Sequence, residues 1–207
     1  IGSPDLAPHP DVVRALQESA APDNVHAYQS YKGSPILRSA IAHWYQKWYG
    51  VTLDPETEVL PLIGSKEGIM HICMTYLNNG DQALIPNPGY PTYSSAVKLA
   101  GGEPVYYDLT LAGNWEPDLV ALEKTDLSKV KLMWVNYPHM PTGQLPSDRF
   151  FEALIAFATK HQILICHDNP YSFILNDTPK SLLAVKGAKE VVVELNSLSK
   201  SSNMAGW

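Results

Sequence analysis

The chain of 207 residues is long enough to bury a substantial core, and its 45% hydrophobic and 17% charged residues are typical of a globular protein. No low-complexity tract is present, which argues against long disordered stretches. The formal net charge of -6 and a pI near 5.6 argue against a nucleic-acid-binding surface or a polybasic membrane patch.

Targeting and redox signals are few. No apolar run approaches the ~20 residues that cross a bilayer, and the N-terminus lacks the charged and apolar regions of a signal peptide. Cys73 and Cys166 lie in apolar runs outside any CxxC pair, so we expect core thiols in a reducing compartment, the cytoplasm. The chain starts at Ile1 and stops at Trp207 without a closing element, from which we expect a piece of a longer protein.

Strand-like and helix-like segments alternate along the chain. The first stretch contains Pro4, Pro8 and Pro10 and is expected to be extended. Strands are predicted at residues 59–63, 83–85, 104–107, 131–135, 162–166 and 191–195. Helices are predicted at residues 36–49, 67–77 and 147–160.

The sequence also predicts the buried face of one of these helices and the N-cap of another. In residues 36–49 one face is apolar and is expected to be core: Leu37, Ile41, Trp44, Tyr45 and Trp48. The helix at 147–160 follows Pro146, and Ser147 fits its N-cap.

Most of the predicted strands are continuously apolar, which indicates that both of their faces are buried. The expected fold is therefore α/β, with a largely parallel sheet covered by helices on both faces. Ligands in such sheets bind beyond the carboxyl ends of the strands. This rule selects the loops at residues 64–67, 136–143, 167–171 and 197–200.

Lys200 lies in a loop of small residues directly after the last predicted strand. A lysine that is kept partly dehydrated in such a place can act as an amine nucleophile toward an aldehyde. Lys200 is therefore a candidate for a Schiff base, and an ordinary surface lysine is the alternative interpretation.

Ser65 and Lys66 stand between a predicted strand and a predicted helix. The backbone N–H groups and the Ser65 hydroxyl could receive a phosphate at the positive end of the helix. A tight turn with an N-cap is the alternative for the same residues.

Asp168 follows the apolar run that ends at Cys166. A buried carboxylate is costly unless it is paired, and a protonated pyridine nitrogen is a suitable partner. Tyr171 could hydrogen-bond a phenolate oxygen on the same ring, and Tyr90 could stack on a flat heterocycle. The alternatives are an Asp turn before Pro170 and a partly buried loop tyrosine.

Taken together, an amine nucleophile, a phosphate cradle, a carboxylate for a ring nitrogen and a stacking ring describe a site for pyridoxal 5'-phosphate. Over all 207 residues the order of motifs also resembles the fold-type I aminotransferases of class I/II, especially the aspartate, alanine and LL-diaminopimelate aminotransferase group.

The resemblance gives each motif a role. Lys200 in SLSK would form the internal aldimine, and Ser197 would be a phosphate ligand. Asp168 and Tyr171 in DNPY would contact the pyridine nitrogen and the ring oxygen.

The other motifs follow in the same way. Ser65 and Lys66 match the phosphate-binding turn, and Tyr90 matches the stacking ring. Tyr28 in YQSYKG resembles the tyrosine that reaches the phosphate of the neighbouring subunit, which implies a homodimer with shared sites. Gly2 resembles a glycine near the substrate carboxylate.

Two features depart from the family pattern. Met140 in NYPHMPTG stands where the family has an asparagine that hydrogen-bonds the ring oxygen, and methionine cannot donate that bond. The family's phosphate-binding arginine would fall just beyond Trp207. Residues 1–30 are accordingly expected to be an N-terminal extended segment with a remnant of the small domain, and residues 31–207 the cofactor-binding large domain, truncated at its C-terminus.

The implied activity is a ping-pong transfer of an amino group between an amino acid and a 2-oxo acid. A β-eliminating lyase on the same fold and a non-catalytic module that binds the cofactor are the alternatives. No metal is expected.

Overall fold

The computed structural model describes residues 3–207, which divide into two compact units. One unit contains the chain up to Pro61 together with Phe173–Pro179 and Ser197–Trp207. The other contains Leu62–Ser172 and Lys180–Asn196. Each unit is described by itself.

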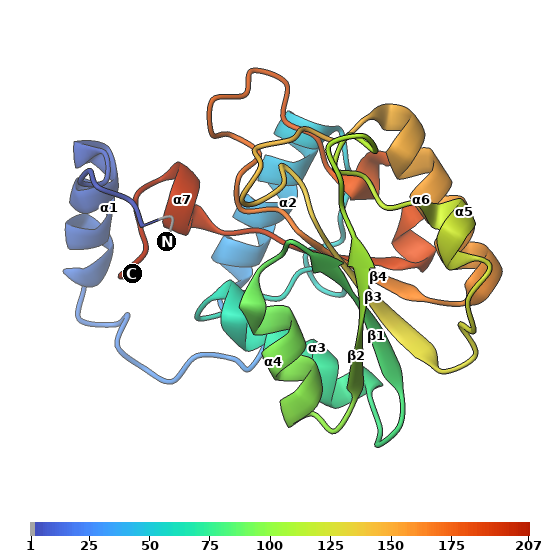
Figure 1. Cartoon of the computed structure of the whole chain (residues 1–207). Coiled ribbons are helices and arrows are strands. Elements are labelled where there is room, and N and C mark those ends of the chain that lie inside the picture. Colours follow the sequence, from blue (N-terminus) through green and yellow to red (C-terminus); the bar gives the residue numbers. More distant parts are fainter. Residues whose placement is uncertain (1–2) are drawn as a thin grey trace. The chain divides into compact units, whose positions relative to one another are not determined.

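The elements follow one another in the order shown in Figure 1. The first unit contains the helices α1 (Pro10–Ala20), α2 (Pro35–Tyr49) and α7 (Leu198–Ser201). The second unit contains α3 (Ser65–Tyr76), β1 (Gln82–Asn87), α4 (Pro91–Leu99), β2 (Glu103–Asp108), α5 (Leu119–Leu122), β3 (Val130–Asn136), α6 (Asp148–His161), β4 (Leu164–Asp168), η1 (Leu182–Ala184), η2 (Ala188–Glu190) and β5 (Val192–Leu195).

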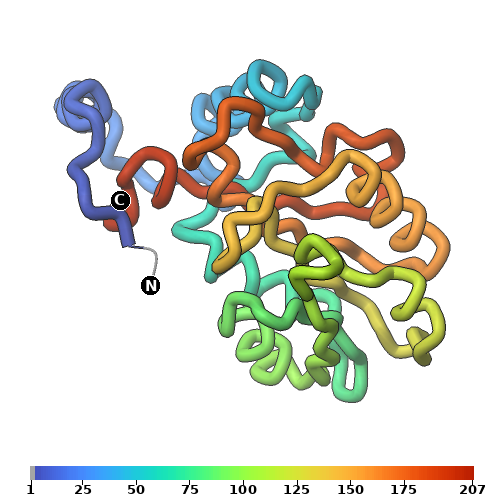
Figure 2. The backbone as a smooth tube through the Cα atoms, turned by 45° about the horizontal axis from the view of Figure 1, so that its top comes forward, coloured from blue at the N-terminus to red at the C-terminus, as the bar shows by residue number. Residues whose placement is uncertain are grey.

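The second unit is built on a five-stranded sheet in the order β2-β1-β3-β4-β5, and each pair of neighbouring strands is parallel. The helices α3 and α4 lie side by side on one face, and α5 and α6 cover the other (Figure 1). The tube view shows the same two layers on either side of the strands (Figure 2). The predicted fold class, a largely parallel sheet covered on both faces, is confirmed.

The strands alternate between two apolar clusters, one on each side of the sheet. In β3, Leu132 and Trp134 pack with α3 and α4, whereas Met133 and Val135 pack with α6, and all four are fully buried. Because both faces are covered, the alternation is hidden in the sequence as one continuous apolar run. Cys73 and Cys166 are free thiols in the first of these clusters, as predicted.

The helix α6 begins as its sequence predicts. The Ser147 hydroxyl accepts a hydrogen bond from the Phe150 N–H at 3.1 Å, which confirms Ser147 as the N-cap. The helix ends at His161, and its C-cap residue Gln162 adopts a left-handed conformation with φ 54°. The predicted strand at 162–166 therefore begins two residues late, at Leu164.

The predicted strand at residues 59–63 is wrong, because this stretch contains no regular element. Pro61 has no N–H to donate to a ladder, and Ile63 is 92% exposed, so the run is not part of a buried sheet.

The first unit also departs from expectation. Pro10 begins the helix α1 within a stretch expected to be extended, because a missing N–H costs nothing at the first helical position. In α2, Tyr45 is buried as predicted, but Leu37, Trp44 and Trp48 are 46%, 37% and 42% exposed. Within residues 3–207 we find no helix whose length and apolar character would let it span a membrane.

Candidate functional site

The carboxyl ends of the strands bring polar side chains to one edge of the sheet. Because the strands are parallel, β1, β3 and β4 all end at this edge, with Asn87, Asn136 and Asp168 as their last residues. Asn136 and Asp168 are register partners, and the Asn136 side-chain amide donates to the Asp168 backbone carbonyl at 2.8 Å. This is the edge that the sequence predicted.

Asp168 is a buried carboxylate with only one oxygen satisfied. The Tyr93 hydroxyl donates to Oδ2 at 2.7 Å, whereas Oδ1 has no hydrogen-bond partner among the described residues. Burial raises the pKa of Asp168 to about 6, although the Tyr93 hydrogen bond and the charge of His167 oppose the rise. Oδ1 is thus ready to accept a proton donor, and a cationic donor would offset the cost of the buried charge.

Aromatic rings line the site on the α4 side of Asp168. Tyr93 stacks on Trp134 with ring centroids 5.0 Å apart and an interplanar angle of 8°. Tyr90 meets Tyr93 edge to face at 5.6 Å. The Lys66 ammonium lies 6.0 Å from the centroid of the Tyr90 ring, at the outer range of a cation–π contact.

Tyr171 belongs to the same group of residues. It is half-buried, and its pKa is raised first by burial and then by the charges of Asp168 and Tyr90. The turn that follows β4 therefore brings a phenol into the electrostatic field of the Asp168 carboxylate.

The N-terminus of α3 supplies backbone donors. The Gly64 carbonyl accepts from the N–H groups of Glu67 and Gly68, and α-helical geometry offers no carbonyl to the N–H groups of Ser65 and Lys66. The positive end of the helix dipole adds to these donors, so this end of α3 suits an anion.

Gly68 holds α3 close to β5. A Cβ atom at this position would lie 2.6 Å from side-chain atoms of both Leu195 and Leu62. Only glycine permits this approach without a shift of its neighbours.

The loop after β3 is held by hydrogen bonds at both of its ends. The Met140 N–H donates to the Asn136 side-chain oxygen at 2.9 Å. His139 contacts the Thr142 hydroxyl at 2.8 Å and the Pro88 carbonyl at 3.2 Å. Burial lowers the pKa of His139, which favours the neutral ring.

The remaining predicted residues belong to the other unit. Ser197 caps α7, accepting from the Ser199 N–H at 3.1 Å, and Lys200 is a half-buried residue of the same helix. Tyr28 is fully exposed. Gly2 lies outside the described residues.

Two members of the site were not predicted from the sequence, namely Tyr93 and Trp134. Tyr93 is three residues after Tyr90, in the first turn of α4, so helical spacing could have pointed to it. Its hydrogen bond to Asp168 joins residues 75 positions apart, and no local pattern predicts such a contact.

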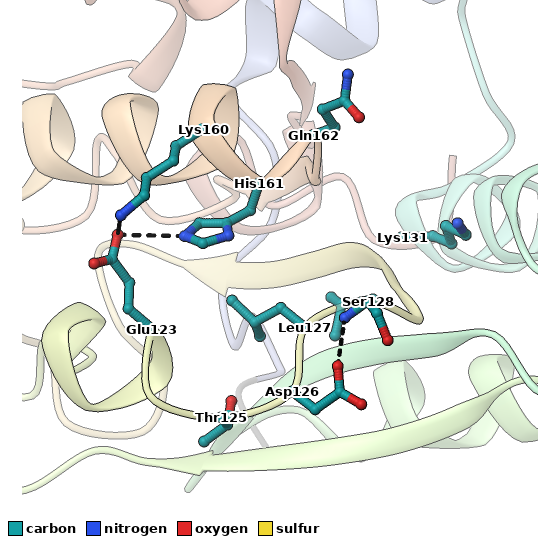
Figure 3. A pocket seen from close by; sticks show the side chains of 10 residues that line it. Glu123, Thr125, Asp126, Leu127, Ser128, Lys131, Lys160, His161 and Gln162 are labelled. Carbon is teal, nitrogen blue, oxygen red and sulfur yellow. Dashed lines mark hydrogen bonds and ion pairs between the residues drawn. The ribbon is translucent and has the colours of Figure 1, made fainter.

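A cavity of about 500 Å³ opens at the opposite edge of the sheet, around the start of β3 and the end of α6 (Figure 3). There Glu123 contacts Lys160 at 2.9 Å and His161 at 3.3 Å, and hydrogen bonds from both lower its pKa. These side chains satisfy one another at a half-exposed surface. We therefore assign the site to the carboxyl edge, where a buried charge is left unsatisfied.

A buried carboxylate with an unpartnered oxygen, tyrosine rings and a helix N-terminus fit a phosphorylated aromatic cofactor with a protonated ring nitrogen. On a parallel α/β sheet this combination defines an enzyme class that depends on pyridoxal 5'-phosphate. The chain belongs to the family described as aminotransferase class I and II, whose family model matches residues 1–207. Members of this family depend on pyridoxal 5'-phosphate.

Individual relatives agree with this assignment. An LL-diaminopimelate aminotransferase of Dehalococcoides mccartyi is 47% identical over 209 aligned positions, which cover all of this chain and 54% of the relative. Substrate-bound BacF from Bacillus subtilis superposes with a TM-score of 0.94 at 42% identity, over the whole chain and 53% of BacF. An aromatic aminotransferase from Pyrococcus horikoshii gives 0.93 at 29%, over the whole chain and 56% of that structure. The chain thus spans about half the length of the relatives it matches.

Proposed function

We propose that the protein to which this chain belongs is an aminotransferase that moves an amino group between an amino acid and a 2-oxo acid. The observation that carries the proposal is the buried Oδ1 atom of Asp168, which has no partner among the described residues. A protonated pyridine nitrogen is the cation that would satisfy it. When bound, pyridoxal 5'-phosphate supplies an electron sink for the carbanion that forms at the substrate α-carbon.

Each predicted residue of the site has a proposed role toward the cofactor ring or the substrate. Lys200 would hold the cofactor through its amine, and the free amine would move a proton at the substrate α-carbon. Asp168 keeps the ring nitrogen protonated. Tyr171 donates to the ring oxygen, and Tyr90 covers a face of the ring.

The phosphate is proposed to be held by hydroxyl, ammonium and backbone N–H donors. Ser65, Lys66 and the first-turn N–H groups of α3 form one part of its cradle, and Ser197 adds a hydroxyl. Tyr28 is fully exposed, and we propose that it reaches the phosphate of a second subunit. This proposed contact implies a homodimer with shared sites. Gly2 is proposed to lie near the substrate carboxylate.

The names of the relatives suggest a substrate. Curated relatives that are 41–47% identical to this chain are called LL-diaminopimelate aminotransferases, so we propose a diaminopimelate-like amino acid as donor or product. We further propose that residues 1–30 are a small-domain remnant, that residues 31–207 are the large domain, and that the enzyme works in the cytoplasm.

The test is the half-reaction of the full-length protein loaded with pyridoxal 5'-phosphate. LL-diaminopimelate, an aromatic amino acid and aspartate are each added without an acceptor. Transamination yields the 2-oxo acid and pyridoxamine phosphate in a single turnover, whereas elimination yields ammonia continuously. A loaded protein that converts none of the donors would reject the proposal.

A further inference from the structure

His167 and Glu194 form a buried pair next to the proposed cofactor site. Their side chains have no exposed surface, and Nδ1 of the imidazole lies 2.8 Å from Oε2 of the carboxylate. His167 directly precedes Asp168 in β4, so the two side chains point to opposite faces of the sheet. The pair therefore lies on the face of the sheet opposite to the Asp168 carboxylate, which faces the site.

The hydrogen bonds around the pair indicate its protonation state. Nε2 of His167 lies 3.0 Å from the Tyr137 backbone carbonyl, which can only accept, so Nε2 carries a proton. Glu194 Oε2 also accepts from the Leu182 N–H at 3.1 Å and from the Ser181 hydroxyl at 2.8 Å. Donors of this kind stabilise an ionised carboxylate, so the proton shared with Nδ1 belongs to the histidine. The geometry is that of an imidazolium beside a carboxylate.

Glu194 also holds the turn that carries Tyr171. Its Oε1 accepts from the Asn169 side-chain amide at 3.3 Å, and the Asn169 N–H donates to the Leu195 carbonyl at 2.8 Å. The Asn169 side-chain oxygen in turn accepts from the Ser172 hydroxyl. The backbone on both sides of Tyr171 is thereby fixed to β5 and its carboxylate.

We propose that His167 and Glu194 are a charged positioning pair for the cofactor site, which fixes the Asp168–Tyr171 segment and places a positive charge behind Asp168. Its meaning for catalysis rests on the proposed function, but the pair itself exists without the cofactor. The charge of His167 acts in the expected direction, because it lowers the pKa of Asp168 against the effect of burial.

Other polar and titratable groups face Asp168 and His167. Tyr93 from α4 and Tyr171 from the turn face Asp168, and their neutral phenols leave His167 as the cation behind it. Glu194 from β5 and the carbonyl of Tyr137 face His167.

The first experiment titrates Asp168 in the cofactor-free, full-length protein. The readout is the infrared band of a protonated carboxyl, assigned by its absence in Asp168→Asn. His167→Gln keeps a hydrogen-bond donor but removes the imidazole, and Glu194→Gln removes the carboxylate that lies 2.8 Å from Nδ1 of His167. We expect the Asp168 midpoint to rise by about one pH unit or more in His167→Gln, because the positive charge of His167 lowers the pKa of Asp168, and not to rise by this amount in Glu194→Gln if His167 keeps its proton. His161→Gln, which breaks the histidine–glutamate contact at the opposite edge, is the matched control and should leave the midpoint in place.

A second measurement needs no variant that alters the pair. In protein labelled with ¹⁵N-histidine, the hydrogen-bond geometry predicts protons on both ring nitrogens of His167. A single protonated nitrogen would overturn the proposal, as would an unchanged Asp168 midpoint in folded His167→Gln. Because neither readout involves the cofactor, failure of the aminotransferase assignment would leave these results standing.

Discussion

At the scale of single residues, Asp168 is a buried carboxylate whose ionisation destabilises the folded, cofactor-free protein. Its pKa is raised from 3.8 to about 6, so between these values the folded state holds a proton that the unfolded state has lost. The contribution of this group to stability is therefore complete below pH 3.8 and is lost as the pH rises through about 6. Above that pH the cofactor-free protein carries a buried negative charge on Asp168, whose Oδ1 has no hydrogen-bond partner among the described residues.

This predicts that Asp168→Asn stabilises the cofactor-free protein at pH 8. The shift in pKa corresponds to an upper limit of about 3 kcal/mol, and the gain should shrink as the pH falls to 5. Urea unfolding of the full-length protein at both pH values measures it. The exposed Asp177→Asn is the control, and a gain equal to that of the control would refute a strained carboxylate.

Met140 gives a second prediction at this scale. By the family resemblance, an asparagine at this position donates to the ring oxygen of the cofactor. Such a donor stabilises the negative oxygen most when the neighbouring imine nitrogen has lost its proton, so Met140→Asn should shift the pH titration of the bound chromophore downward by roughly half a unit to one unit. Met140→Leu should leave the titration unchanged. Identical curves for all three proteins would show that position 140 does not contact the ring.

At the scale of elements, strand positions were predictable because the central strands β1, β3 and β4 are apolar runs buried on both faces of the sheet. The failures have local physical reasons. The run at 59–63 is apolar in composition but contains Pro61 and remains exposed, and Pro10 begins a helix where it was expected to prevent one. The predicted loops at the carboxyl edge contain Asp168 and Tyr171, since parallel strands all end there. The Tyr93 contact depends on how α4 packs, which no motif in the sequence encodes.

The packing of α3 on β5 makes a testable prediction. Gly68→Ala would place a methyl group 2.6 Å from Leu195 and displace the start of the helix. We expect about tenfold weaker binding of pyridoxal 5'-phosphate and a smaller loss for pyridoxal, which lacks the phosphate. Met74→Ala, on the exposed side of α3, is the control. Equal losses for both ligands would mean that α3 does not contribute to the phosphate site.

At the scale of the whole molecule, the proposed site rests on the geometry around Asp168 in one unit and on sequence motifs in the other. In the described part of the second unit, the buried polar side-chain atoms without a hydrogen-bond partner are Asp168 Oδ1 and Trp134 Nε1. The sequence motifs predicted the position of Asp168 but not its surroundings. The first unit contains Ser197 and Lys200, whose proposed roles come from their motif. The central claim is the proposal that Lys200 forms the covalent bond to pyridoxal 5'-phosphate.

Borohydride reduction tests this claim most directly. The full-length protein is incubated with pyridoxal 5'-phosphate, its visible spectrum is recorded, and the reduced protein is digested and mapped by mass spectrometry. The account predicts a visible chromophore and a pyridoxyl label on Lys200, with no chromophore in Lys200→Ala. A folded protein that stays colourless, or that carries its label on another lysine such as Lys66, would contradict it.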